Sequence, residues 1–322
     1  MLGDKFYALK QCVLTIWLGL SFFFAIAQED SIKWVETYPD TWSMRTYGIV
    51  KAQGLSLINP QGERLDYLPD NIFGIGLGVS YDFINIDLGL TVGGPQSITT
   101  RFDFQGNLFF GKSTFDLYLQ LYRGFRVVNP ENVEPPEQQE RRDIQTAAIG
   151  VNYIYVFNGD KLSARAVFTG DYRQERSIGS WMVGGFTSFF LMRADSSIVP
   201  TGDNRFDEEA QLKEITLNST GVTAGYSYNH VFPSKFNIFV SVLPGIGINS
   251  GNTTSEDIFS PQFAEVYRLQ GTLAIGYGNE KFYTALSSAT DFYWISLGEN
   301  RFIYSLIKIK GLIGYRFRRK GN

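Results

Sequence analysis

Cysteine and histidine each occur only once among the 322 residues, as Cys12 and His230. Cys12 lies inside an N-terminal apolar segment that we expect to be removed, so the exported chain would hold no disulfide and no cysteine-ligated metal. Neither charge dominates, because 29 Lys and Arg residues face 32 Asp and Glu residues and the formal net charge is −3. This composition predicts no nucleic-acid partner, and we expect neither a metal site nor a cofactor.

Long apolar runs are absent beyond the first 27 residues. Residues 1–27 carry Lys5 and Lys10, then an apolar stretch from Val13 to Ile26, and end at the small-x-small site Ala25-Ile26-Ala27. This is the pattern of a cleaved signal peptide. The apolar stretch of about 14 residues falls short of the roughly 20 that a spanning helix needs. The sequence therefore predicts an exported protein without a transmembrane helix.

Strict alternation of apolar residues with small or polar ones is the main pattern in the rest of the chain. From Phe73 to Tyr81 large apolar residues alternate with glycine or serine, and after Asp82-Phe83 the alternation resumes from Ile84 to Val92. A period of two is typical of β-strands, and a two-residue link between two such runs predicts a tight hairpin.

The same alternation recurs in further segments: 101–110, 115–122, 147–157, 267–277 and 303–317. Their apolar rows are bulky, whereas the opposite rows mix glycine, amide, tyrosine and charged side chains. This combination suits a barrel with lipid outside and a polar lumen inside. The predicted fold is all-β: a closed transmembrane antiparallel β-barrel.

Short and long connections alternate along the chain. The short ones are 82–83, 111–114, 158–160, 194–196, 232–235 and 278–281, and the long ones are 54–70, 94–100, 127–143, 173–180, 201–213, 250–262 and 290–301. Short turns of outer-membrane barrels lie in the periplasm. Including Ser197–Thr201 as a strand predicts a closed meander of about 14 strands, and omitting the weakly alternating Met44–Gln53 would give 12.

The predicted organisation has four parts: a signal peptide at 1–27, a periplasmic segment or plug at 28–43, the transmembrane barrel at 44–317 and a C-terminal tail at 318–322. We expect the mature chain to reside in the outer membrane of a Gram-negative bacterium. Its partners would then be outer-membrane lipid and, during biogenesis, the barrel-insertion machinery.

Several stretches resemble one known family. They are Arg45-Thr46-Tyr47, Tyr67-Leu68-Pro69 followed by Gly76 to Tyr81, Phe115 to Gln120, Gly225 to Tyr228 followed by Leu243-Pro244-Gly245, and Gly314 to Phe317. Together they make nearly the whole mature chain similar to the domain of unknown function 4421 family. The resemblance implies an outer-membrane barrel of Gram-negative bacteria without an assigned activity. It implies no functional residues.

The polar rows supply the candidate site. We expect these residues to line the lumen: Asn85, Asp87, Arg101, Asp103, Gln105, Asn107, Asp116, Tyr118, Gln120, Tyr122, Arg165, Arg268, Gln270, Lys308 and Lys310. They would either form a selective path or hydrogen-bond across a closed interior. A turn at Gly111–Thr114 would pair Gln105 with Gln120, Asn107 with Tyr118 and Asp103 with Tyr122. The Asp82-Phe83 turn would pair Asp87 with Gly78 and Asn85 with Ser80.

Four further features suggest chemistry but also have plainer interpretations. His230, on an outward row near the 232–235 turn, would be a hydrolase base or an interfacial residue. The glycines at 74, 76 and 78 would leave lumen space or let a neighbouring segment approach closely, and a plug formed by residues 28–42 would fit there. The acidic cluster carries oxygen ligands of the kind that calcium takes but lacks a recognised calcium-loop spacing, and the 127–143 loop would dock a partner or face solvent. The cluster comprises Asp203, Asp207, Glu208 and Glu209.

Two functions remain open at this level. A passive, porin-like channel or transporter for small polar solutes follows from the mixed polar rows. A non-catalytic structural or accessory barrel in a larger outer-membrane assembly, such as a secretion or barrel-insertion complex, follows from the lack of a recognisable ligand constellation. Because no nucleophile paired with a base is evident, we predict that the protein is not an enzyme. An outer-membrane hydrolase is the remaining alternative.

Overall fold

The computed structural model describes residues 33–94, 96–128, 139–255 and 258–318. The predicted signal peptide, residues 28–32, most of the acidic 127–143 loop and the tail from residue 319 lie outside the described residues. No helix in the described part of the chain is long and apolar enough to cross a membrane.

The strands are β1 (Val35–Thr37), β2 (Thr41–Ile58), β3 (Arg64–Leu68), β4 (Phe73–Tyr81), β5 (Ile84–Thr91), β6 (Thr100–Phe110), β7 (Ser113–Val127), β8 (Glu140–Val156), β9 (Tyr172–Gln174), β10 (Ile178–Arg193), β11 (Leu212–Val231), β12 (Phe236–Ser255), β13 (Ile258–Gly278), β14 (Phe282–Leu297) and β15 (Asn300–Arg318). Two short helices complete the described elements, α2 (Arg165–Phe168) and η3 (Glu208–Ala210).

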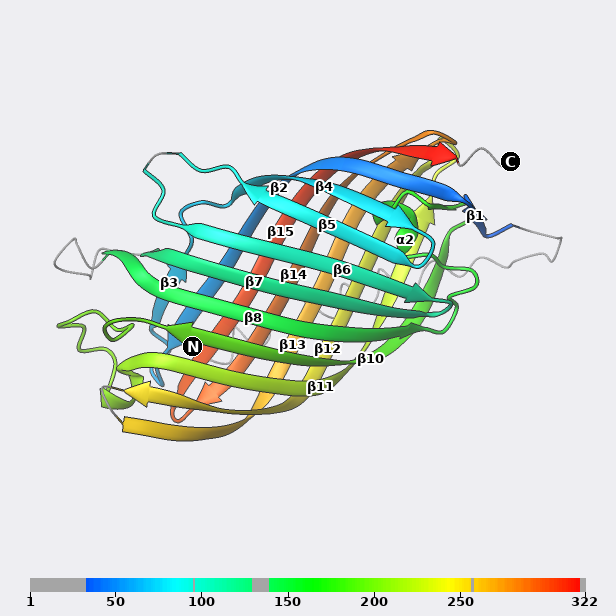
Figure 1. The fold of residues 1–322 in the computed structure, drawn as a ribbon. Coiled ribbons are helices and arrows are strands. Elements are labelled where there is room, and N and C mark those ends of the chain that lie inside the picture. The colour runs from blue at the N-terminus through cyan, green and yellow to red at the C-terminus, as the bar shows by residue number, and fades with distance from the viewer. Residues whose placement is uncertain (1–32, 95, 129–138, 256–257, 319–322) are drawn as a thin grey trace. The chain divides into compact units, whose positions relative to one another are not determined.

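Thirteen strands form one sheet, which closes because β15 pairs antiparallel with β2 (Figure 1). The short β3 pairs with β2 and β7 at one end only. Removing β3 from the thirteen leaves twelve strands in the closed ring, since every other strand is bonded to a neighbour on each side. The predicted closed transmembrane antiparallel barrel is confirmed. Closure matters because it leaves no unpaired backbone edge in lipid.

The preferred count of 14 strands is wrong, for two local reasons. Ser197–Thr201 forms no strand and belongs to a loop at 194–211. Residues 158–160 are not a turn between ring strands but the beginning of a segment, 157–177, that contains α2 and β9. The alternative count of 12 is correct in number, but Met44–Gln53 is not the stretch to omit, because it lies within β2.

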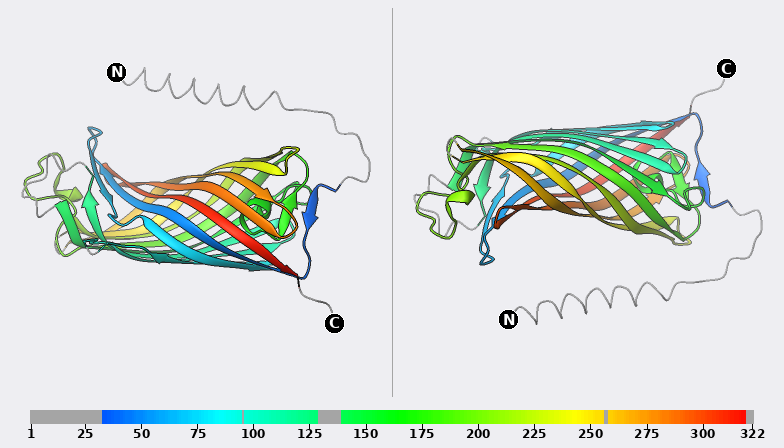
Figure 2. Two further views of the ribbon diagram at one scale, coloured as in Figure 1. Left: turned by 90° about the horizontal axis from the view of Figure 1, so that it is seen from above. Right: turned by 90° about the horizontal axis from the view of Figure 1, so that it is seen from below.

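The barrel has two different ends. The turn end, where β2 begins and β15 ends, carries the tight links 82–83, 111–112, 232–235 and 279–281 and the 157–177 segment (Figures 1 and 2). The loop end carries β3, the 92–99 loop and the 194–211 loop. The 194–196 turn was therefore expected at the wrong end. The loop expected at 290–301 is also wrong, because β14 continues to Leu297 and meets β15 across a two-residue turn.

The outer face of the barrel is apolar towards the turn end. Leu77, Val222 and Ile313 are among the exposed large apolar side chains. Aromatic rings from adjoining strands touch near this end, including Trp42 with Tyr81 and Phe282 with Tyr315. The tight turns lie beside them. An apolar band with an aromatic girdle is the expected surface of a transmembrane barrel.

The polarity of the two faces reverses along β11. From residue 222 towards the turn end, apolar Val222 and Tyr226 alternate outward with inward Thr223, Ser227 and Asn229. From residue 220 towards the loop end, the outward row is Glu214, Thr216, Asn218 and Thr220, while Ile215 and Leu217 are buried inside. Polar residues outside and apolar residues inside are typical of a barrel surrounded by water. We infer that the loop end projects beyond the lipid.

An apolar core fills the interior of this loop end. Ring strands contribute buried Leu55, Phe186, Phe190, Ile215, Leu217, Val266, Ile295, Phe302 and Tyr304, and the 194–211 loop adds Ile198, Val199, Phe206 and Ala210. The rings of Phe190 on β10 and Tyr304 on β15 lie 4.7 Å apart although four strands separate β10 from β15. The lumen is therefore filled with packed side chains at the loop end.

The 157–177 segment covers the other mouth of the barrel (Figure 2). Leu162 and Val167 pack into a second apolar cluster with Phe239 and Ala274 of the ring. Ser43 Oγ donates a hydrogen bond of 2.6 Å to the carbonyl of Thr169. Within the same segment β9 pairs with β1. The described part of the predicted N-terminal segment thus forms a small sheet at the turn end.

Asp70 fastens the 92–99 loop at the loop end. Its carboxylate accepts hydrogen bonds from the backbone N–H groups of Ile98 and Thr99, at 2.9 and 3.0 Å, and from Ser97 Oγ at 2.9 Å. Burial acts to raise the pKa of Asp70, but these hydrogen bonds outweigh it and hold the pKa below its usual range.

We expect acid to release this loop. A depressed folded pKa means that the carboxylate stabilises the loop fully above its unfolded pKa of about 3.9 and loses this effect as the pH falls through the folded pKa. Asp70→Asn should therefore speed hydrogen exchange at residues 97–99 at pH 7, while the wild-type loop stays protected. Asp160→Asn, in an exposed pair with Lys112, is the control. Equal exchange in Asp70→Asn and the wild type at pH 7 would contradict the assignment.

Candidate functional site

Charged side chains cross the middle of the barrel. Lys310 Nζ on β15 lies 2.8 Å from Asp87 Oδ2 on β5, and Tyr304 OH donates to Gln120 Oε1 on β7 at 2.7 Å. None of these strand pairs are neighbours in the ring. The contacts must therefore pass through the interior, which places the charged side chains of these strands in the lumen.

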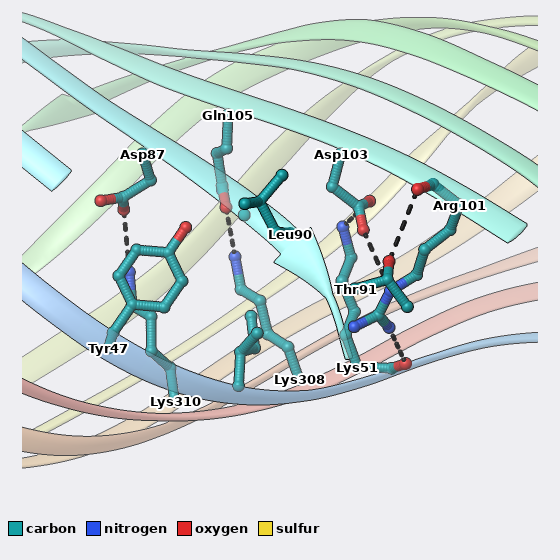
Figure 3. A pocket seen from close by; sticks show the side chains of 12 residues that line it. Tyr47, Lys51, Asp87, Leu90, Thr91, Arg101, Asp103, Gln105, Lys308 and Lys310 are labelled. Atoms are coloured by element: carbon teal, nitrogen blue, oxygen red, sulfur yellow. Dashed lines mark hydrogen bonds and ion pairs between the residues drawn. The ribbon is translucent and has the colours of Figure 1, made fainter. Parts of the chain in front are cut away.

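Asp87 is the centre of the first charged cluster (Figure 3). It accepts from Arg45 Nη2 at 2.5 Å and from Lys310 Nζ at 2.8 Å. The ammonium of Lys310 also lies 4.8 Å from the centre of the Tyr47 ring, which adds a cation–π contact. One carboxylate thus compensates two cations.

Asp103 is the centre of the second cluster, next to the first. Lys51 forms an ion pair with it, and Arg101 Nε lies 3.8 Å from its other oxygen. Arg101 is held in place by the carbonyl of Lys51 at 2.8 Å and by Thr91 Oγ1 at 3.1 Å (Figure 3). Here too a single carboxylate faces two cations.

Arg268 on β13 forms a third cluster on the opposite wall. Its guanidinium makes two parallel contacts with Asp291, Nε to Oδ1 at 2.8 Å and Nη2 to Oδ2 at 2.5 Å. Nη1 donates to Asn152 Oδ1 of β8 at 2.7 Å. The ring centres of Phe186 and Tyr293 lie 4.9 and 5.0 Å from the guanidinium carbon. A bidentate pair of this kind, with the Arg268 side chain fully buried, fixes the positions of both side chains.

A hydrogen-bond chain leads from the first cluster along the wall. Arg45 Nη2 donates to Asn85 Oδ1 at 2.6 Å, Asn85 Nδ2 donates to Asn107 Oδ1 at 2.7 Å, and Asn107 Nδ2 donates to Asp116 Oδ1 at 2.6 Å. Side-chain networks of this sort hold their members rigidly when every group is satisfied.

Three cavities adjoin these clusters around Gln105 and Lys308, with volumes of about 50, 60 and 190 Å³. The largest, which we call the chamber, extends from the charged middle to the 157–177 segment, where Ala164, Phe168 and Thr169 line it. Both polar and apolar side chains line the chamber.

The structure brings most of the predicted lumen residues together. Fourteen of the fifteen lie on ring strands and border the interior, in the clusters, beside the cavities or, for Tyr122, in the loop-end core. Arg165 does not lie on a ring strand but on α2, where it pairs with Asp171 at the turn end. That the interior residues line a path for solutes remains a prediction.

The two predicted registers had different outcomes. The pairs Gly78 with Asp87 and Ser80 with Asn85 are confirmed. The pairs around the next turn are wrong by two residues. Gln105 faces Tyr118, Asn107 faces Asp116 and Asp103 faces Gln120. The reason is that the strands continue to Phe110 and Ser113, which leaves a two-residue turn rather than four.

Sequence reasoning missed Arg45, Lys51 and Asp291. Arg45 and Lys51 share odd positions with Tyr47 on β2, all three buried, and this parity was the available signal. Asp291 was assigned to a loop, although it continues the inward row of Tyr283, Ala285 and Ser287. Each of the three forms an ion pair with a partner across the ring or on the next strand.

Large side chains of neighbouring strands, rather than the described part of the N-terminal segment, lie over the glycines of β4. A Cβ on Gly76 would meet the ring of Tyr47, and one on Gly78 would meet Arg45 and Asp87. The close-approach interpretation of these glycines is therefore correct, and the small residues make room for the first charged cluster.

Gly76→Ala is expected to destabilise the barrel by about 1–3 kcal/mol, because the added methyl group displaces Tyr47 from Lys310. Gly48→Ala is a matched control, since nothing lies within 4 Å of its Cβ. Urea unfolding in lipid vesicles measures both. A Gly76→Ala variant as stable as Gly48→Ala would refute the close contact.

His230 lies on the outer face of β11 between Tyr228 and Phe232. Its Nδ1 is 3.3 Å from Ser177 Oγ, which accepts a hydrogen bond from the backbone N–H of Val231 at 2.9 Å. No carboxylate in the described residues hydrogen-bonds to this ring, whereas a hydrolase triad orients its histidine with one. The contact fastens residue 177 to β11.

The acidic cluster has protein partners. Asp203 binds the guanidinium of Arg205 at 2.6 Å, and Asp207 accepts from the N–H of Ala210 at 3.0 Å as the cap of η3. No group of three His, Cys, Asp or Glu side chains within the described ranges is arranged to hold a metal ion.

Comparisons with known proteins complete the description of the site. A family model described as domain of unknown function (DUF4421) matches residues 28–317. No curated protein matches the chain. Among solved structures, the chain is similar to the toluene transporter TodX of P. putida, with 9% identity over 88% of this chain and 91% of TodX and a TM-score of 0.26. It is also similar to OmpT, an outer membrane protein of Vibrio cholerae, with 8% identity over 91% and 100% of the two chains and a TM-score of 0.30.

Proposed function

The chain belongs to the domain of unknown function (DUF4421) family, and since that description assigns no activity, we propose from the barrel's interior that it is a closed outer-membrane barrel with a structural or accessory role. The observation that carries the proposal is the apolar core of the loop end. Wall residues and the 194–211 loop pack together there across the lumen. A pore that is permanently open to polar solutes needs a continuous aqueous path, which such a core interrupts.

The outer-membrane location is supported by the outer surface. A closed ring leaves no unpaired strand edge, and the apolar band with its aromatic girdle matches the surface that lipid requires. The short turns then face the periplasm, and the loop end projects from the opposite side. The partners in this proposal are outer-membrane lipid, the barrel-insertion machinery during assembly, and an outer-membrane protein complex.

Crosslinking followed by gentle solubilisation of the natively expressed protein tests the structural role. We expect a defined complex that contains this chain in a fixed ratio to at least one other envelope protein. Recovery of only free monomer, from cells in which a known complex survives the same treatment, would contradict it.

A second function, gated passage of small polar solutes, is favoured by the chamber and the charged clusters. It requires the 157–177 segment and the loop-end core to move, because these cover the two sides of the chamber. Solute-driven swelling of proteoliposomes tests this second function. The closed barrel predicts no swelling with the wild-type protein.

A further inference from the structure

The chamber is lined by polar and apolar side chains. Its charged and amide groups include Asp87, Gln105, Asp116, Gln270, Lys308 and Lys310. Its apolar groups include Met182, Phe239 and Leu243 of the ring and Phe168 of the 157–177 segment. Its volume of about 190 Å³ exceeds the roughly 150 Å³ of an engineered cavity that holds benzene. A molecule of that size with a polar head and an apolar side chain would fit this lining.

Two charged groups of the chamber, Lys308 and Asp116, form no direct ion pair. Among the described residues, Lys308 Nζ has one hydrogen-bond partner, Gln105 Oε1 at 3.0 Å, and Asp116 has one, Asn107 Nδ2 at 2.6 Å. Neither forms an ion pair in the described residues, in contrast to Asp87 and Lys310 beside them. Lys308 therefore keeps N–H donors and Asp116 keeps acceptor lone pairs that border the chamber. Enclosed charges without a partner are unfavourable.

We propose that the chamber binds a small zwitterion, an α-amino acid with an apolar side chain. The carboxylate of the ligand pairs with Lys308, its ammonium group pairs with Asp116, and its side chain packs against Phe168, Phe239 and Leu243. The two charges of the ligand satisfy the two protein charges that have no ion pair. The ligand thereby gives both Lys308 and Asp116 a direct ion pair.

The charge balance of the chamber favours a zwitterion over a simple anion or cation. Two lysines, at 308 and 310, and two aspartates, at 87 and 116, border it, and these charges cancel. A monoanion would satisfy Lys308 and leave Asp116 unpaired, and an amine would do the reverse. Discrimination follows, because a site built for a polar group rejects a ligand that leaves it unsatisfied.

Isothermal titration calorimetry on the folded, purified barrel with three ligands of one shape is the experiment. L-Leucine carries both charges, 4-methylpentanoate only the carboxylate, and 3-methylbutylamine only the ammonium group. We expect leucine to bind at least about tenfold more tightly than either analogue. Equal binding of the three, or no binding of leucine to a barrel that shifts on unheated gels as folded, would overturn the proposal.

Two variants make the assignment residue-specific. Asp116→Asn should weaken the binding of leucine and shift the binding preference towards 4-methylpentanoate. Lys308→Gln should shift the preference towards 3-methylbutylamine. If the two residues had a purely structural role, each variant would bind all three ligands more weakly by the same factor and leave the order of their affinities unchanged. That result would refute the roles assigned. Lys51→Gln is the matched control, because it removes an interior lysine that pairs with Asp103 and does not line the chamber. Binding is measured separately from conductance, so a failure here leaves the closed-barrel proposal intact.

Discussion

Arg268→Ala is expected to lower the free energy of unfolding by about 3–5 kcal/mol, because it leaves the carboxylate of Asp291 enclosed without its partner. The guanidinium supplies two contacts to that carboxylate and one to Asn152. The replacement therefore breaks an interaction between three strands. Urea unfolding in lipid vesicles measures the loss.

The matched control for this prediction is Arg193→Ala. Arg193 also pairs with an acidic residue on the next strand, Glu214, at 2.9 Å, but its side chain is 64% exposed. Water screens such a pair, and its loss is expected to cost about 0–1 kcal/mol. Removing both Arg268 and Asp291 should restore part of the stability, because no charge is then left unpaired. Equal losses for Arg193→Ala and Arg268→Ala would show that the interior pair is solvated.

Phe190→Ala is the second large effect that we expect, a loss of about 3–5 kcal/mol from a cavity in the loop-end core. Phe190 is 4% exposed and contacts the rings of Phe302 and Tyr304 across the lumen. Phe189→Ala, one residue earlier, is the control, since that side chain points outward and is 37% exposed. If the two alanine variants lose equal stability, residue 190 does not lie in a packed core.

The barrel and one of its hairpins could be predicted because alternation and turn chemistry agree there. Apolar residues alternate without a break from Phe73 to Tyr81, and the two-residue link at 82–83 fixes the register on its own. At 111–114 the alternation continues up to the turn from both sides, so the sequence leaves the length of the turn open. The turn has two residues instead of the four expected, and this difference shifts every cross-strand pair of the hairpin.

The filling of the lumen could not be predicted from the same pattern. The rule that bulky residues face lipid holds only within the membrane, and on β11 the two faces exchange polarity near residue 221. Beyond that point inward residues such as Ile215 and Phe302 are apolar. Alternation alone has the same period on either side of this boundary, so it cannot tell which face is inside.

The pairing of charged residues that lie far apart in the sequence could not be predicted either. Arg45 and Asp87 are 42 residues apart, and Lys310 and Asp87 are 223 apart. Which cation meets which carboxylate depends on the tilt and closure of the whole ring. The sequence therefore predicted most of the interior charges individually but not their clusters, nor that Lys308 and Asp116 have no ion pair.

Single-channel recording of the unmodified protein in planar bilayers tests the closed barrel most directly. A packed loop-end core predicts no steady conductance from the wild type, while a variant with Phe190, Phe302 and Tyr304 all replaced by alanine should show openings. Steady, ion-selective conductance from the folded wild-type barrel would contradict the account.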